Sequence, residues 1–205
     1  MSTAFDSTLD SLRAGETVLV PTDTVYGLAA LPGSAGYDRI FELKQRPVGQ
    51  TLPWLVSSLE MFHQYADAVP SWADCLASAF WPGALTLVVG ASNKAKLLGR
   101  PAPDGTIAFR IPDEPLVRKL IQELGCPIAC TSANLHGMPA QRDFSALDAR
   151  FRELAYPFDD AYAPRCAGGC ASTIVDCSGE GLRVLREGPI SEEGLLAVAK
   201  KSHRP

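Results

Sequence analysis

Apolar and polar residues recur along the chain with two periods, one typical of helices and one typical of strands. Apolar residues spaced three and four positions apart predict helices over 5–14, 34–44, 70–80, 114–124, 146–155 and 191–201. Short runs rich in β-branched and other apolar residues predict strands over 17–20, 24–30, 52–57, 85–91, 106–112, 172–178 and 181–187, and a strand that runs into a loop over 126–134. The last two strands flank a glycine-containing turn and are expected to form a hairpin-like pair, whereas 91–105 is expected to be a polar loop.

The residues at the ends of these segments indicate where helices begin and end. Ser34 is the expected N-cap of the second helix, Pro70 is expected at the first helical position of the third, and Gly125 is expected just beyond the end of the fourth. Strands and helices alternate without a strict strand–helix–strand rhythm. The pattern therefore predicts an α/β fold with a mixed rather than a purely parallel sheet.

Length and charge narrow the class of protein. The chain has 205 residues, of which 46% are hydrophobic and 20% charged, and no linker-like tract divides it, so a single domain over 1–205 is expected. The net charge of -4 argues against a general nucleic-acid binder, which is normally basic. No apolar run approaches the ~18 residues of a membrane span, and we expect a cytoplasmic protein that does not contact a membrane.

Two pairs of closely spaced cysteines raise the question of a metal site. If 126–130 is a strand, its rise holds Cys126 and Cys130 ~13 Å apart, too far to share one ion. Cys166 and Cys170 flank a probable loop, where a turn brings their sulfurs together as a disulfide or as half of a zinc site. A zinc site needs two more ligands, and no histidine is near in sequence. Free thiols in a reducing compartment are the favoured interpretation, and no metal site is predicted.

Two cations, Lys44 and Arg46, fall where the second helix must end, because Pro47 stops it. One interpretation is structural: cations in a last helical turn interact favourably with the helix dipole, by roughly 0.3–1 kcal/mol each. The other is that the two side chains converge on an anion, because Arg46 precedes a proline and is driven into extended geometry. From this stretch alone, both interpretations stay open, with the structural one preferred.

Two polar motifs follow apolar runs and carry candidate ligand groups. The segment PTDTVYGL supplies hydroxyls and a carboxylate beside Gly27, where backbone can approach a ligand closely; they belong to Thr22, Asp23, Thr24 and Tyr26. The segment TSAN follows the strand at 126–130, and Ser132 and Asn134 point to one face if the chain stays extended there. An ordinary polar turn explains either motif equally well.

Arginines within predicted strands need a counter-charge. Arg110 lies in IAFRIP and Arg186 in RVLREG, and an arginine among apolar neighbours is costly to bury unless an acidic residue or a ligand anion pairs with it. No glycine-rich phosphate loop is present. A nucleotide bound to this chain would have to be held by side chains.

The order of these motifs is more specific than any one of them. PTDTVYGL, ELKQRP, FWPGALTLV, IAFRIP, TSANLHG, STIVD and VLREGPI succeed one another as in the YrdC-type threonylcarbamoyl-AMP synthase family, which the chain resembles over about residues 10–190. The resemblance implies a twisted, open α/β domain with a concave basic face. It also implies conversion of L-threonine, bicarbonate and ATP to threonylcarbamoyl-AMP and pyrophosphate, the first step of threonylcarbamoyladenosine formation in tRNA.

The resemblance also assigns roles to residues. It places Lys44, Arg46, Ser132 and Asn134 on the ATP phosphates, with Lys44 and Arg46 as the catalytic cations, and Arg186 facing the nucleotide. It places Thr22, Arg110 and Ser172 on the threonine substrate. Mg²⁺ is expected to accompany the ATP phosphates without a protein cage, and the product is expected to pass to a separate tRNA threonylcarbamoyl-transfer complex.

The chain departs from the family pattern at Gln50, where many members have lysine or asparagine, which leaves one phosphate contact open. The expected form is the short, single-domain one. The main alternative function is a non-catalytic double-stranded RNA or tRNA binder that uses the same concave face, and weak tRNA binding is also compatible with the enzyme. A carbamoyl-transfer enzyme of the hydrogenase-maturation type would need further modules, and intact KQR and TSAN argue against a degenerate paralogue.

Overall fold

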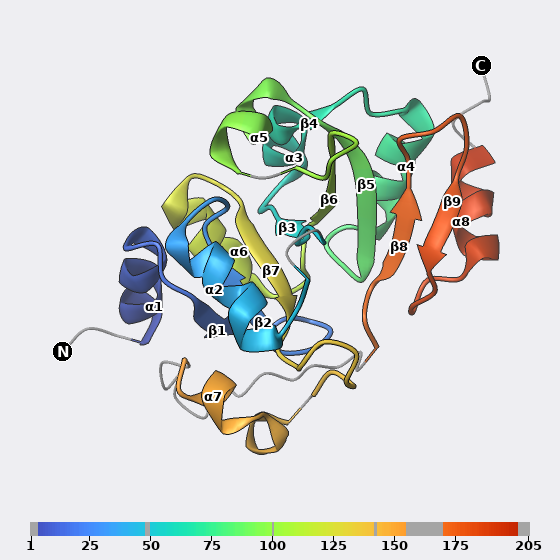
Figure 1. Ribbon diagram of the computed structural model, residues 1–205. Coiled ribbons are helices and arrows are strands. Elements are labelled where there is room, and N and C mark those ends of the chain that lie inside the picture. The colour runs from blue at the N-terminus through green and yellow to red at the C-terminus, as the bar shows by residue number, and fades with distance from the viewer. Residues whose placement is uncertain (1–3, 48–49, 100, 142, 155–169, 201–205) are drawn as a thin grey trace.

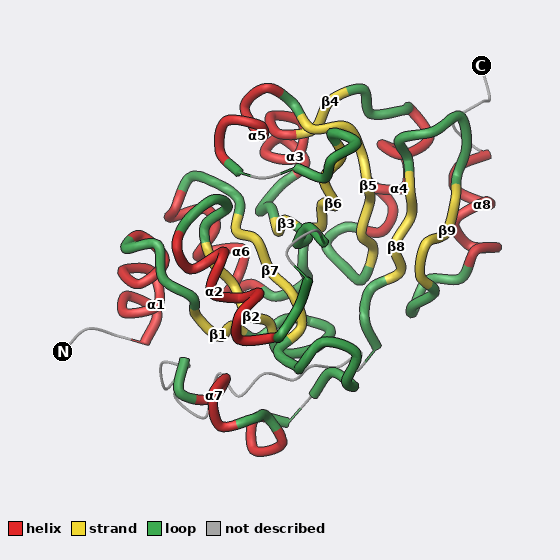
Figure 2. Tube along the Cα trace, viewed as in Figure 1, coloured by secondary structure: helices red, strands yellow, loops and turns green. Residues whose placement is uncertain are grey.

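One mixed sheet runs through the protein, with helices on both sides of it (Figures 1 and 2). The computed structural model describes residues 4–47, 50–99, 101–141, 143–154 and 170–200. The strands follow the order β1-β2-β7-β3-β6-β5-β8-β9, and β4 pairs with β5 outside that path. Strands β3 and β6, and strands β5 and β8, are parallel, whereas the remaining pairs are antiparallel. The predicted open, mixed α/β fold is confirmed.

The element bounds locate each motif. The strands are β1 Val18–Val20, β2 Gly27–Ala30, β3 Trp54–Leu55, β4 Ala66–Asp67, β5 Leu85–Ala91, β6 Thr106–Arg110, β7 Ile128–Ser132, β8 Thr173–Asp176 and β9 Arg183–Arg186. The helices are α1 Ala4–Arg13, α2 Ala35–Lys44, α3 Leu59–Tyr65, α4 Ser71–Phe80, α5 Asn93–Leu98, α6 Pro115–Leu124, η1 Phe144–Ala146, α7 Ala149–Arg152 and α8 Glu192–Ala199.

Most predicted helices are confirmed, and their caps explain why. The Ser34 side chain accepts from the backbone N–H of Tyr37 and begins α2. Gln45 takes the left-handed conformation that ends α2, and Gly125 does the same after α6. Strands β8 and β9 pair antiparallel as predicted, with a register shift between Ile174 and Val175.

Several predictions were wrong, each for a local reason. The predicted loop 91–105 contains α5, which Ser92 caps by accepting from the N–H of Ala95. Helix α3 and strand β4 were missed because a helix of two turns gives little periodicity. Pro70 is the N-cap of α4 rather than its first helical residue. The strand predicted over 24–30 begins only at Gly27, because the residues before it form a turn.

The predicted helix over 146–155 is also wrong in its extent. Its described part divides into the 3-10 turn η1 and the short helix α7, whereas Ala155 lies outside the described residues. The predicted C-terminal helix is shorter than expected, since α8 ends at Ala199 and is followed by Lys200 as its C-cap; Lys201 lies outside the described residues.

The two faces of the sheet are covered differently. One face packs against α2, α3, α4 and α8 in a large core that is centred on the edge-to-face rings of Trp54, Phe62 and Phe109. On the other face, α1 and α6 cover the β1-β2-β7 end through a second core that includes Leu12, Leu120 and Ile128. Beyond α1 and α6, this second face carries the candidate site.

No helix among the described residues is long and apolar enough to cross a membrane. The single domain over 1–205 and the concave basic face stay predictions.

Candidate functional site

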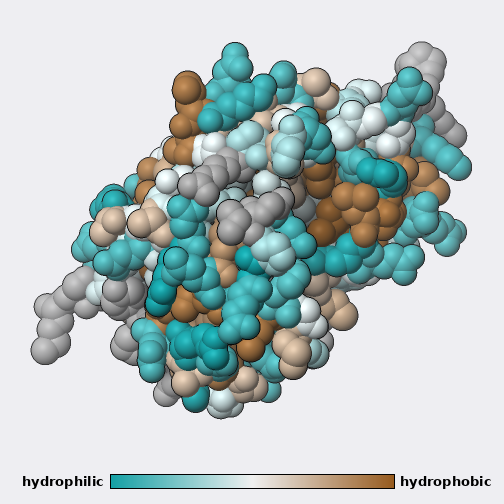
Figure 3. Space-filling model, in the orientation of Figure 1, coloured by the Kyte–Doolittle hydropathy of each residue, from teal (hydrophilic) through white to brown (hydrophobic). Residues whose placement is uncertain are grey.

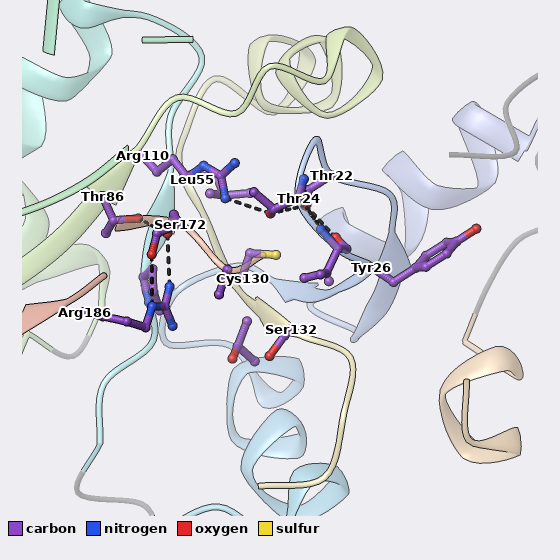
Figure 4. Close-up of a pocket in the computed structure, with 15 residues that line it drawn as sticks. Thr22, Thr24, Tyr26, Leu55, Thr86, Arg110, Cys130, Ser132, Ser172 and Arg186 are labelled. Carbon is purple, nitrogen blue, oxygen red and sulfur yellow. Dashed lines mark hydrogen bonds between the residues drawn. The ribbon is translucent and has the colours of Figure 1, made fainter. Parts of the chain in front are cut away.

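A cavity of about 100 Å³ opens where the second core ends (Figure 4). Leu55 and Cys130 belong both to that core and to the cavity wall, so the cavity continues the face that α1 and α6 cover. The turn before β2, strands β3, β5, β6 and β7, the residues before β8, and β9 all contribute to it. Its lining residues are Thr22, Thr24, Val25, Tyr26, Gly27, Pro53, Leu55, Thr86, Arg110, Cys130, Thr131, Ser132, Ala171, Ser172 and Arg186.

Thr22 organises the turn that forms one wall. Its hydroxyl donates to the carbonyl of Val25 at 2.5 Å and accepts from the N–H groups of Thr24 and Val25. It also contacts the Thr24 hydroxyl at 3.0 Å. A hydroxyl that binds the backbone of the following residues holds a tight turn. This turn explains why the strand predicted from residue 24 starts three residues later.

Arg110 is fixed at the end of β6 by three donated hydrogen bonds. Its Nε donates to the carbonyl of Gly83 at 2.8 Å, and its Nη1 to the Thr24 hydroxyl at 3.0 Å. Its Nη2 donates to Asp23 Oδ2 at 2.6 Å in an ion pair whose side chains are 8% and 14% exposed. The other oxygen of Asp23 is buried and has no hydrogen-bond partner among the described residues. Asp23 therefore neutralises Arg110, as the burial of an arginine requires.

Arg186 lines the cavity from β9, and its recorded acceptors are neutral. Its Nε donates to the carbonyl of Ser172 at 3.0 Å and its Nη2 to the Ser172 hydroxyl at 3.1 Å. The same hydroxyl lies 2.7 Å from the hydroxyl of Thr86 on β5. Figure 4 shows these side chains as one connected group, with Arg110 above it and Cys130 to its right in this view.

The two arginines make the cavity electropositive. Burial lowers the pKa of the Arg186 guanidinium, and the charge of Arg110 lowers it further. Among the described residues Arg110 has a carboxylate partner and Arg186 has no ion pair. Arg186 is an exposed residue of β9, and a guanidinium that no described carboxylate neutralises attracts an anion.

Lys44 lies outside the cavity lining and holds the TSAN turn. Only 2% of this residue is exposed, and its ammonium donates to the carbonyl of Ser132, to the carbonyl of Asn134 at 2.6 Å and to Asn134 Oδ1 at 3.4 Å. Burial lowers its pKa to about 8, and the nearby charge of Arg46 contributes to this shift. The three N–H groups of the ammonium thus have three acceptors.

Arg46 follows the left-handed residue that ends α2. Its Nη2 donates to the carbonyl of Thr51 at 3.2 Å, and its buried Nε has no partner among the described residues. Burial lowers the pKa of this guanidinium as well. The charge of Arg46 acts on Lys44, but the hydrogen bond that its side chain donates goes to the backbone, so convergence of the two cations on an anion stays a prediction.

Ser132 and Asn134 do not continue as one extended strand. Strand β7 ends at Ser132, and the N–H of Asn134 donates back to the Ser132 carbonyl at 3.0 Å. Ser132 lines the cavity, whereas the Asn134 amide donates to the carbonyls of Leu135 and Met138. The condition for both side chains to share a strand face is not met, and Asn134 instead stabilises the turn that Lys44 holds.

Thr86 and Cys130 are among the cavity residues that sequence reasoning missed. Thr86 lies within the apolar run LTLVVGA, and strand alternation alone does not say which of its residues face a site. Cys130 is buried against Gly27, and burial raises the pKa of its thiol to about 12, so the thiol stays neutral. A β-carbon on Gly27 would lie 2.5 Å from the Cys130 sulfur, which is why this position needs glycine.

The described residues contain no group of three or more His, Cys, Asp and Glu side chains that could hold a metal ion. Cys170 is an exposed free thiol, and Cys166 lies outside the described residues.

Comparison with known proteins gives consistent results. The model of the Sua5/YciO/YrdC family, described as "Telomere recombination", matches residues 10–188. The chain is 34% identical over 198 residues to threonylcarbamoyl-AMP synthase of Bacillus subtilis, covering 94% of this chain and 55% of the relative. It is also 34% identical over 194 residues to the putative threonylcarbamoyl-AMP synthase of Mycobacterium tuberculosis H37Rv, covering 94% of this chain and 87% of that protein.

A solved structure of Sua5 from Pyrococcus abyssi, complexed with L-threonine, superposes with a TM-score of 0.81 at 32% identity. The alignment covers 95% of this chain and 56% of that one. The chain thus spans little more than half of two of these proteins and most of the third.

Proposed function

The chain belongs to the Sua5/YciO/YrdC family, and from this premise we propose that it is a threonylcarbamoyl-AMP synthase. The proposed reaction joins L-threonine, bicarbonate and ATP to give threonylcarbamoyl-AMP and pyrophosphate, which makes the protein a nucleotidyltransferase. The observation that carries the proposal is the cavity itself. It gathers the Arg110, Ser132, Ser172 and Arg186 side chains of four separate motifs around one electropositive space.

The cavity suits the small substrates rather than the nucleotide. Its volume of about 100 Å³ is well below the roughly 300–1,000 Å³ of pockets for drug-sized ligands. We place threonine against Arg110, with Thr22 and Ser172 near it. The guanidinium is held in position by Asp23, Thr24 and Gly83 and keeps further N–H groups for a carboxylate.

ATP then lies outside the cavity, near Lys44, Arg46, Ser132, Asn134 and Arg186. Arg46 supplies charge and an Nε–H group that is buried and unpartnered among the described residues. Lys44 supplies charge and also holds the turn of Ser132 and Asn134 in place. Cations are needed here because a helix C-terminus has a negative potential and would repel phosphates.

The sheet beside the cavity offers an apolar surface for a base. Val88 and Ala108 lie two residues along their strands from Thr86 and Arg110 and therefore share their face, and Ile174 lies opposite Arg186. All three apolar residues are half-buried. Figure 3 shows an apolar surface at this end of the molecule, over β8 and β9. We propose that the adenine ring packs on this surface.

The proposed reaction has two steps. The ammonium group of threonine first loses a proton to solvent. The neutral amine then attacks bicarbonate, and water leaves as the carbamate forms; attack on CO₂, which forms from bicarbonate by uptake of a proton and loss of water, releases a proton instead. A carbamate oxygen then attacks the α-phosphorus of ATP, and the bond to the β-phosphate breaks to release pyrophosphate. Alignment and neutralisation of charge supply most of the rate enhancement in phosphoryl and nucleotidyl transfer, which fits a site of arginine, lysine and hydroxyl groups without a nucleophile.

Mg²⁺ is proposed as a companion of the ATP phosphates. The described side chains do not form a cluster that would hold it, so we assign it no protein ligands. The product is proposed to pass to a separate complex that transfers the threonylcarbamoyl group to tRNA.

The proposal is tested by measuring pyrophosphate release from ATP with threonine and bicarbonate omitted in turn. We expect release to require both compounds. Release that ignores both omissions would exclude the reaction, and salt-sensitive tRNA binding without any release would favour an RNA-binding module instead.

A further inference from the structure

The hydroxyl groups of Thr86 and Ser172 form a pair whose hydrogen bonds can be counted. Thr86 is 2% exposed and Ser172 is 5% exposed, and both line the cavity. Each hydroxyl has one O–H to donate. Their 2.7 Å contact uses one of the two O–H groups, whichever residue is the donor, and Arg186 donates to the Ser172 hydroxyl. The second O–H therefore has no acceptor among the described residues, and the pair offers it to a ligand in the cavity.

Within the part of the chain that the structure describes, no carboxylate pairs with the charge on this side of the cavity. The recorded acceptors of Arg186 are the carbonyl and hydroxyl of Ser172, both neutral. Across the cavity, Arg110 is paired with Asp23. One side of the space thus combines a guanidinium and a carboxylate, and the other combines a guanidinium and a hydroxyl donor.

We propose that Thr86 and Arg186 form the seat of bicarbonate, and that Ser172, which also lies near threonine, donates to Thr86, so that the O–H of Thr86 contacts the substrate. An amino acid is a zwitterion with no net charge, which matches the neutral Arg110–Asp23 side. Bicarbonate is a net anion without an ammonium group, which matches the unpaired guanidinium and the spare O–H. Both sides face one cavity, so the bound amine and the one-carbon substrate meet in it.

The inference rests on the proposed function and deepens it. A planar carboxylate group is the shared chemistry of bicarbonate and of the amino-acid carboxylate. The two sources are separated by titrating each substrate in turn.

The test uses the full chain with Thr86→Val, which keeps the shape of the side chain and removes the hydroxyl. Pyrophosphate release is titrated with bicarbonate in CO₂-depleted buffer at saturating threonine and ATP, and then with threonine at saturating bicarbonate. We expect the KM for bicarbonate to rise roughly 10-fold or more, as for loss of a hydrogen bond to a charged group, while the KM for threonine stays within about twofold.

Two further variants sharpen the result. Thr86→Ser restores the hydroxyl and should return the KM for bicarbonate to near the wild-type value. Thr106→Val removes a hydroxyl that donates to Asp104, outside the cavity lining, and should leave both KM values unchanged. If Thr86→Val melts at a much lower temperature than the wild type, Thr86→Ala is measured in the same way.

An unchanged KM for bicarbonate in the hydroxyl-free variant would overturn the proposal, and so would a rise confined to the KM for threonine. A readout without turnover separates this failure from failure of the proposed function. Bicarbonate alone should raise the melting temperature of the wild-type protein and not that of Thr86→Val. Absence of that stabilisation in the wild type would overturn the seat even if the enzyme turns over.

Discussion

Arg110 Nη2 lies 2.6 Å from Asp23 Oδ2, although the two residues are 87 positions apart in the chain. The contact joins the turn before β2 to the end of β6 and is largely buried. It gives Arg110 a structural role in addition to any contact with substrate. A conservative substitution separates these roles.

Arg110→Lys keeps the charge but not the planar fork that forms two parallel hydrogen bonds with a carboxylate. If Arg110 binds the threonine carboxylate, affinity for threonine should fall by roughly 1.5–3 kcal/mol, about 10- to 200-fold, with little change for ATP. The measurement is a threonine titration of pyrophosphate release together with a melting curve. A lowered melting temperature with the threonine KM within about twofold of wild type would restrict Arg110 to the structural role.

Asn134→Ala should weaken ATP binding by roughly 1–3 kcal/mol, because the turn loses bonds to Lys44, Leu135 and Met138. Calorimetric titration with ATP measures the change. Gln141→Ala is the matched control, since this half-buried side chain bonds only to the nearby carbonyl of Pro139 among the described residues. Equal ATP affinity in the two variants would contradict a role for Asn134.

Ser132→Ala tests the cavity end of the same motif. Because Ser132 lines the cavity from the end of β7, loss of its hydroxyl should also weaken nucleotide binding by roughly 1–3 kcal/mol. The same calorimetric titration applies. If this variant has the turnover and the ATP affinity of the wild type, Ser132 does not contribute to nucleotide binding and is only part of the turn.

Lys44 predicts a pH dependence of activity. Because burial lowers its pKa to about 8, kcat/KM for ATP should fall as the pH rises through about 8 and the ammonium loses its proton. Arginine at this position stays charged over this pH range. The kcat/KM of Lys44→Arg for ATP should therefore not fall near pH 8, even if it is lower than that of the wild type at every pH. Persistence of the step in Lys44→Arg would assign it to another group.

The free energy of unfolding should not fall over the pH range in which activity is lost. The pKa of Lys44 is about 8 in the folded protein and has its usual value of 10.5 in the unfolded chain. Between these two pH values the unfolded chain therefore binds more protons than the folded chain. The contribution of Lys44 therefore makes the free energy of unfolding rise with pH across that range. Denaturant unfolding at pH 7.5 and pH 9 distinguishes this from a loss of fold.

Gly27→Ala should destabilise the protein by roughly 1–3 kcal/mol, because its β-carbon would overlap the Cys130 sulfur at 2.5 Å. In the double variant with Cys130→Ala the next atom is the Thr131 carbonyl oxygen at 3.5 Å, an ordinary contact. Urea unfolding of both single variants and the double variant should then show a coupling of about 0.5–3 kcal/mol. Strictly additive costs would mean that the strain lies elsewhere.

The sequence predicted the elements whose signals are local and missed those that depend on tertiary contacts. Ser34 and Gly125 mark helix ends through their own backbone and side-chain chemistry, so they could be read directly. Helix α3 and the turn at Thr22 are short, and packing and local hydroxyl bonds define them more than periodicity does.

The same distinction holds for the site. Arg110 and Arg186 were recognisable because an arginine in an apolar strand needs a partner, but only the structure shows that Asp23 pairs with the first of them. Lys44 was recognisable as a cation at a helix end, yet its acceptors are carbonyls 88 and 90 residues away. Thr86 carried no signal, because an isolated threonine in a strand is an ordinary residue.

The position of β7 between β2 and β3 has a consequence for synthesis of the chain. The hairpin of β1 and β2 is complete by residue 30, but its neighbour in the sheet is made only at residues 128–132. A two-stranded hairpin alone is marginal in water. The cavity wall formed by the turn at Thr22 is therefore expected to stay unstable until about 100 more residues have been synthesised and β7 can pair with β2. Strand β9, from which Arg186 lines the cavity, is synthesised later still. The cavity therefore cannot be complete before β9 has been synthesised, and variants that slow pairing of β2 with β7 should aggregate during expression even where the finished protein is stable.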